Sequence, residues 1–208
     1  MRSKSKSLKM MLSAAALVLS AGIAPAAAQT GTAPAAVAPA DVRELATTVV
    51  QQYNSIKSLL IKTVDAMPAD AFGFQPVPEM RTFAGTVGHL ASSNIGQCSA
   101  LLGKKHELSG QDLSKTLKTK EEAVKAVADS YAFCDEFFSG IKTNAQLVDT
   151  YYTGTMTRNG APVPFKMANG AVAEGLIAHN NEEYGYLAVY LRLKGIVPPS
   201  SVPPPVKK

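Results

Sequence analysis

The sequence predicts an all-α fold, a four-helix bundle, with either a short hairpin or a loop before the last helix. Four segments carry apolar residues at alternating three- and four-residue steps, and proline or glycine separates them. The chain has 208 residues, of which 46% are hydrophobic and 7% aromatic, which fits one globular core. Four long amphipathic helices bury their apolar faces by packing on one another.

The N-terminal residues 1–28 are predicted to be a cleavable signal peptide. A basic segment, Arg2–Lys9, precedes the apolar run Met10–Ile23, and Ala26–Ala28 supplies small residues for cleavage after Ala28. The apolar run is shorter than the roughly 20 residues that span a bilayer, although a retained anchor is the alternative. We therefore expect a periplasmic or secreted protein with no membrane contact after cleavage.

The positive charge of the chain lies largely in this predicted leader. The whole sequence has 21 Lys and Arg against 16 Asp and Glu, and four basic residues precede position 10. No acidic residue precedes Asp41, so cleavage leaves 17 basic and 16 acidic residues. Because nucleic-acid binding needs clustered excess positive charge, we expect no nucleic-acid partner.

The rest of the chain divides by composition. Residues 29–40 are uncharged and rich in Ala, Pro and Thr, which predicts a flexible linker. Residues 41–198 carry the amphipathic segments and form the predicted bundle. Residues 199–208 are predicted to be an extended proline-rich tail, because proline cannot continue a helix.

The first helix is predicted to begin at Asp41 and to run for about 25 residues, with Glu44 completing a capping box. Three prolines, at 68, 76 and 78, mark the loop that follows. The apolar stripe of this first helix consists of Val42, Leu45, Val49, Tyr53, Ile56, Leu60 and Val64.

The second helix is predicted from about Thr82 to Leu102, ending at Gly103. The third helix is predicted to begin at Thr119, where Glu122 again completes a capping box. Its apolar stripe consists of Val124, Val127, Tyr131, Cys134, Phe138 and Ile141.

The fourth helix is predicted from about Ala168 to Leu193, with Gly195 beyond its end. Before it, Asn159–Gly160 is a tight-turn signal. The segments Tyr151–Thr157 and Val163–Phe165 could be short strands on either side of this turn, and a loop fits equally well.

Two polar residues interrupt the apolar stripe of the fourth helix. His179 and Glu183 lie one turn apart on this stripe, and such spacing lets two side chains reach one metal ion. His89 lies on a face of the second helix made of small residues, which leaves room for a cavity. Together the three residues predict a two-histidine, one-carboxylate site with positions open for water or substrate. The alternative is a hydrogen-bonded core cluster, with Glu183 paired to a lysine or arginine.

Glu182 lies to the other side of His179 and is the candidate general base or a reserve ligand, although a solvated glutamate is the alternative. The remaining histidine, His106, follows Gly103 among charged residues and is predicted to lie at the surface. No P-loop, G-x-G-x-x-G, G-x-S-x-G or C-x-x-C motif occurs, which excludes the common nucleotide-binding and serine-hydrolase classes.

Cys98 and Cys134 lie at similar depths in the second and third helices. Parallel helices would place the two sulfurs at one level, whereas antiparallel helices would separate them by roughly 15 Å. An exported protein meets an oxidising compartment, so a disulfide is one alternative. Two small buried core thiols are the alternative that the sequence alone favours.

Four segments resemble the DinB-like (damage-inducible) superfamily of metalloenzymes: Pro76–Phe83, Val87–Leu90, His179–Gly185 and Tyr190–Ser200. The resemblance covers most of residues 41–201, and the last segment is the most specific. It implies a four-helix bundle whose second and third helices run parallel, which is the arrangement that a disulfide would need.

The resemblance also implies a divalent metal, zinc or nickel, held by one histidine on the second helix and by an H-x-x-x-H pair on the fourth. By position these fall on His89, His179 and Glu183, so the third histidine is replaced by a carboxylate. Glutamate binds zinc or iron, and the site becomes two histidines and one glutamate.

Members of the superfamily include thiol-cofactor-dependent transferases and isomerases, and hydrolases. Because the thiol cofactors are cytoplasmic, we expect an exported member to be a metal-dependent, hydrolase-like protein with Glu182 as base. Its substrate is an unidentified small molecule. The alternative is a metal-free bundle that binds a small ligand or a protein partner; a homodimer is one such arrangement, and the sequence does not fix it.

Overall fold

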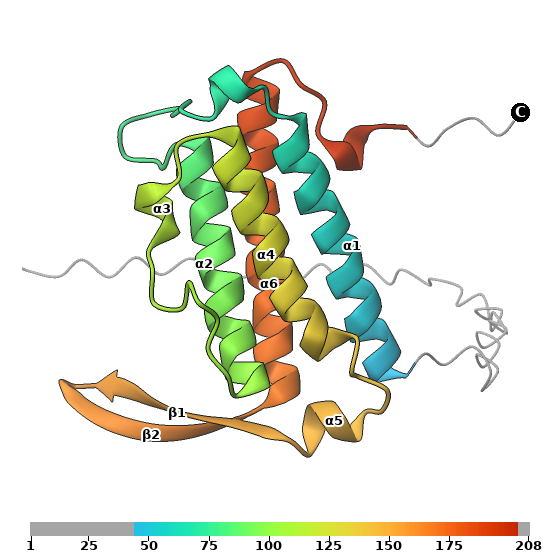
Figure 1. Ribbon diagram of the computed structural model, residues 1–208. Coiled ribbons are helices and arrows are strands. Elements are labelled where there is room, and N and C mark those ends of the chain that lie inside the picture. Colours follow the sequence, from blue (N-terminus) through green and yellow to red (C-terminus); the bar gives the residue numbers. More distant parts are fainter. Residues whose placement is uncertain (1–43, 204–208) are drawn as a thin grey trace, which may run out of the picture. The chain divides into compact units, whose positions relative to one another are not determined.

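The computed structural model describes residues 44–203, and this part of the chain is mostly helical (Figure 1). It contains six α-helices and one two-stranded antiparallel sheet. The predicted signal peptide (1–28), linker (29–40) and last tail residues lie outside the described residues. Within the described part, none of the helices combines the length and the apolar character that a membrane span requires.

The four long helices lie where the apolar periodicity predicts them. They are α1 (Leu45–Ala66), α2 (Phe83–Leu102), α4 (Lys120–Phe138) and α6 (Asn169–Leu193). Shorter elements connect them: η2 (Ala69–Ala71), α3 (Leu113–Thr116) and α5 (Ala145–Val148).

Two of the predicted helix starts are confirmed by their caps. The Thr119 side chain accepts a hydrogen bond from the Glu122 backbone, and the Glu122 carboxylate accepts one from the Thr119 backbone. The Thr82 hydroxyl caps α2 by accepting from the Gly85 backbone at 3.0 Å. Gly103, with φ of 65°, ends α2 in the left-handed conformation that glycine adopts without strain.

The first helix begins differently from the prediction. Asp41 lies outside the described residues, and Glu44 occupies the N-cap of α1 without a side-chain capping bond. Asn144, far along the chain, takes that role: its side-chain oxygen accepts from the Ala46 backbone at 2.9 Å, and its amide donates to the Glu44 carboxylate. A residue distant in sequence therefore accepts the hydrogen bond of one backbone N–H in the first turn of α1.

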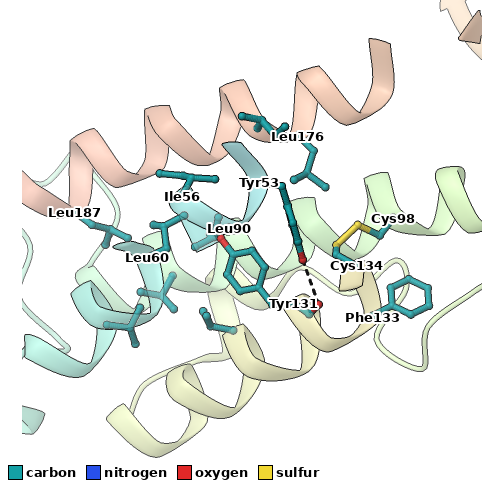
Figure 2. Packing of buried hydrophobic residues seen from close by; sticks show 14 of the residues in the cluster. Tyr53, Ile56, Leu60, Leu90, Cys98, Tyr131, Phe133, Cys134, Leu176 and Leu187 are labelled. Carbon is teal, nitrogen blue, oxygen red and sulfur yellow. Dashed lines mark hydrogen bonds between the residues drawn. A yellow bond between two sulfur atoms is a disulfide. The ribbon is translucent and has the colours of Figure 1, made fainter. Parts of the chain in front are cut away.

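The long helices surround one core. α2 packs against both α4 and α6, and α1 packs against α6 and α4. In Figure 1, α2 and α4 both descend from the upper end, whereas α1 and α6 rise, so α2 and α4 run in the same direction. Figure 2 shows the core, in which the Tyr53 hydroxyl donates a hydrogen bond to the Tyr131 carbonyl at 3.3 Å. The Tyr53 ring also stacks on the ring of Phe138.

A disulfide joins Cys98 of α2 to Cys134 of α4, with their Cα atoms 5.2 Å apart (Figure 2). The expectation of two core thiols is therefore wrong. The bond forms because the two helices run in the same direction, which brings residues of similar depth to one level. Both cysteines are fully buried.

The segment before α6 is a hairpin and not a loop. Strands β1 (Tyr151–Arg158) and β2 (Ala161–Ala168) pair antiparallel over eight residues each. Asn159 and Gly160 both have positive φ, as the tight turn requires. The strands are longer than the sequence pattern indicates, and most of their side chains are exposed.

The start of the predicted extended tail is helical. Pro199–Ser201 forms the 3₁₀-helix η3, which lies beside α1. The Ser200 backbone donates to the Tyr184 hydroxyl at 3.0 Å, and Arg192 donates to the Ser201 hydroxyl at 2.9 Å. Proline is compatible with the first position of a helix, because its missing N–H would have no partner there.

Candidate metal centre

Three polar side chains meet where α2 and α6 pack together. His89 lies in the second turn of α2, and His179 and Glu183 lie one turn apart on α6. One ligand atom from each lies within 4.8 Å of the others, so the group could hold a metal ion. The structure thus brings together the three residues that the sequence singled out as ligands.

The distances within this group suit a metal ion. The two Nε2 atoms of His89 and His179 are 3.2 Å apart, and the Glu183 Oε1 atom is 3.6 Å and 3.5 Å from them. A tetrahedral ion with bonds of about 2.0–2.2 Å holds its ligand atoms about 3.3–3.6 Å apart.

Glu183 is buried without the partners that a carboxylate normally needs. The residue is only 3% exposed, and its Oε2 atom has no hydrogen-bond partner within residues 44–203, whereas Oε1 faces the two imidazoles at 3.5 and 3.6 Å. A buried carboxylate in this state is costly unless it is protonated or coordinated. The two imidazoles hydrogen-bond to each other at 3.2 Å and contact only Oε1, so a cluster of these three side chains leaves Oε2 without a partner.

The electrostatics of the group favour neutral imidazoles. Burial lowers the pKa of His89, with smaller contributions from the charges of Arg81 and His179, and burial also lowers the pKa of His179. Burial raises the pKa of Glu183 to about 7. Near neutral pH both imidazoles therefore carry a free lone pair, which is the state that binds a metal ion.

The group opens onto a cavity of about 630 Å³ between α2, α6 and the loop before α2. The cavity is lined by Glu79, Met80, Arg81, Thr86, His89, His179, Glu182, Glu183, Tyr186 and Tyr190. Glu182 lies on its exposed wall, outside the ligand group, and accepts a hydrogen bond from the Tyr186 hydroxyl at 3.3 Å. A ligand could therefore reach both the metal ligands and Glu182.

A second groove of similar size, about 600 Å³, lies between α1 and α6. Its lining contains a single carboxylate, Glu174, and neither histidine nor cysteine. His106 lies apart from both grooves, half-buried, with its ring centroid 5.0 Å from that of Phe133. His106 lines a smaller groove of about 300 Å³ with Glu107, Asp129 and Glu136. Within residues 44–203, however, only the group at His89 brings three metal-binding atoms within 4.8 Å of one another.

Sequence reasoning missed the role of Arg81 and Tyr186 in this cavity. Tyr186 shares the apolar stripe of α6 with His179, so its spacing carried a signal. Arg81 precedes the N-cap of α2 and belongs to no periodic pattern; its place in the cavity depends on how the preceding loop folds over α6.

Comparison with known proteins bears on the fold. A family model described as the DinB superfamily matches residues 52–187. A DinB-like protein from Bacillus cereus is 18% identical, with a TM-score of 0.57 over 74% of this chain and 95% of that one. A conserved protein from Enterococcus faecalis is 15% identical, with a TM-score of 0.52 over 73% of this chain and 98% of that one. No curated protein matches the sequence.

Proposed function

The chain belongs to the DinB superfamily, and on this premise we propose that it is an exported protein with a divalent metal site formed by His89, His179 and Glu183. We interpret its four long helices as the four-helix bundle of DinB type. The proposed activity is hydrolase-like and acts on a small molecule.

The observation that carries this proposal is the state of Glu183. Its carboxylate is buried, its Oε2 atom has no hydrogen-bond partner within residues 44–203, and its Oε1 atom lies 3.5–3.6 Å from two imidazole nitrogens that face each other. A shared divalent cation satisfies all three side chains at once, whereas a proton satisfies at most two.

Two imidazoles and a carboxylate suit zinc, nickel or iron, and zinc is our first candidate. A bound ion supplies a Lewis acid that polarises an oxygen atom of water or of the substrate. Within residues 44–203 three side chains would serve as ligands, so positions remain for such an oxygen.

Glu182 is the proposed general base. Its carboxylate lies on the cavity wall beside the ligand group and is exposed, so it can exchange protons with the solvent. The Tyr186 hydroxyl, one turn later on α6, donates a hydrogen bond to it at 3.3 Å. In this position Glu182 accepts a proton from water or from the substrate without occupying a ligand position.

Elemental analysis tests the metal site directly. The untagged protein, expressed with its own leader, should contain about one equivalent of zinc, nickel or iron. His179→Ala and Glu183→Ala should each lose most of this metal, because two ligands bind an ion far more weakly than three. His106→Ala and Glu174→Ala remove the same side-chain types outside the group and should keep the parent content.

Folding of the variants should be checked by circular dichroism, so that loss of metal is not loss of structure. A parent that holds no metal even after supplementation would contradict the proposal. In that case the cavity would be that of a metal-free bundle that binds a small ligand or a protein partner.

Export is tested by the N-terminus of the mature protein. Expression of the full chain in a bacterium should yield a periplasmic or secreted form that begins at Gln29, as mass spectrometry would show. Replacing the small residue before the predicted cut, Ala28→Phe, should leave the leader attached. The buried Cys98–Cys134 disulfide supports this proposal, because such bonds persist in oxidising compartments. A parent chain that retains residues 1–28 would contradict it.

A further inference from the structure

We propose that the molecule bound in the cavity carries a carboxylate and that Arg81 binds this group. The inference rests on the proposed metal site and adds the chemical class of its ligand. It depends on the position of Arg81, on the partners its side chain lacks, and on the charges that share the cavity wall.

The backbone of Arg81 is held in place from both sides. The hydroxyl of the buried Tyr190, on α6, donates to the Arg81 carbonyl at 2.6 Å. Before it, the Gln75 side chain donates to the Met80 carbonyl, and after it Thr82 caps α2. Arg81 is therefore attached to the same two helices that carry the metal ligands, which fixes where its side chain begins.

The Arg81 guanidinium has no carboxylate partner within the described residues. Glu79 and Glu182 line the same cavity, yet neither comes within 4.0 Å of it. The side chain nevertheless lines the same cavity as His89, His179 and Glu183. An unpaired guanidinium beside a set of metal-binding atoms offers a second attachment point for a ligand.

A carboxylate fits this attachment point better than a phosphate does. The planar guanidinium donates two parallel hydrogen bonds to a carboxylate. The carboxylates of Glu79 and Glu182 lie on the same wall and offset the positive charge of Arg81, so this wall suits a group with a single negative charge. We therefore expect a ligand with one oxygen at the metal ion and a carboxylate at Arg81.

Two hydroxamates of equal length test this inference. Succinic acid monohydroxamate and butyrohydroxamate share the metal-binding group and differ only in a terminal carboxylate or methyl group. The zinc-loaded protein should bind the first about tenfold more tightly, as measured by calorimetry, because the second makes no charge-assisted hydrogen bond. Arg81→Gln should bring the two affinities within about twofold of each other, without changing the zinc content.

The matched control is Arg158→Gln, which removes an identical charge at the hairpin turn, outside the cavity. This variant should still bind succinic acid monohydroxamate about tenfold more tightly than butyrohydroxamate, as the parent does. A preference that survives in Arg81→Gln, or equal affinities for the zinc-loaded parent, would overturn the inference and leave the metal site standing. Binding of neither hydroxamate to the zinc-loaded parent would also overturn it. A parent that holds none of zinc, nickel or iron even after supplementation would instead contradict the proposed function.

Discussion

Removing the Cys98–Cys134 disulfide should lower the free energy of unfolding by about 3–4 kcal/mol. The bond joins α2 to α4 across 36 positions of sequence, and loop-closure entropy for a loop of this length predicts a loss of that size at 25 °C. Both cysteines are fully buried in the main core, so the cross-link restrains two of the four long helices where they pack together.

Urea unfolding of the parent in its oxidised and reduced forms measures this effect. The Cys98→Ala/Cys134→Ala double variant serves as the comparison, since it lacks the bond and cannot reform it. Reduced parent and double variant should unfold at similar urea concentrations, both well below the oxidised parent. Equal midpoints for the oxidised and reduced parent would contradict the prediction.

Gly88→Ala should destabilise the protein by about 1–3 kcal/mol, although alanine is the better helix former. A Cβ atom at this position would lie 2.3 Å from the Leu113 carbonyl oxygen and 2.6 Å from the Leu113 carbonyl carbon. These are backbone atoms at the start of α3, so no side-chain rotation relieves the clash, and α3 has to move away from α2.

The contact that such a movement would break is extensive. Ala91 and Ile95 of α2 form a small separate core with Leu113 and Ala126. The Ser92 hydroxyl accepts from the Leu113 backbone at 3.0 Å and donates to the Gln111 carbonyl at 3.1 Å. Glycine at position 88 therefore permits the close approach on which this part of the fold depends.

Gly96→Ala is the matched control, because it makes the same change on the same helix at an exposed position with nothing within 4 Å. It should raise the free energy of unfolding by up to about 1 kcal/mol, through helix propensity alone. Thermal or urea unfolding of the two variants should thus show shifts of opposite sign. Two stabilising substitutions would rule out the close approach of α3 to Gly88 in solution.

Local signals predicted the regular elements well. The four long helices lie where apolar periodicity placed them, and the capping box at Thr119 and the turn at Asn159–Gly160 are present. Such features depend on neighbours within a few residues, so a short stretch of sequence contains all the groups that form them. The cap of α1 was not predicted correctly, because its partner, Asn144, lies about a hundred residues away and belongs to no local sequence pattern.

One part of the candidate site likewise follows from local sequence, and the other part depends on tertiary packing. Helical spacing alone places His179 and Glu183 on one face of α6, whatever that helix packs against. The sequence by itself therefore indicated the family, the long helices and all three candidate ligands, but it placed only His179 and Glu183 beside each other. Periodicity identifies which face of a helix is buried. It does not identify which other helix packs on that face, in which direction that helix runs, or which of its residues lie at the same level.

Tertiary packing decided the rest. The contact between α2 and α6 brings His89 to within 3.2 Å of His179, 90 positions later in the chain. Because α2 and α4 run in the same direction, Cys98 and Cys134 lie close enough to form a disulfide. The loop before α2 folds over Tyr190 and places Arg81 on the cavity wall. Each of these contacts depends on the relative position of elements that are distant in sequence, and only the packing of the whole core sets that position.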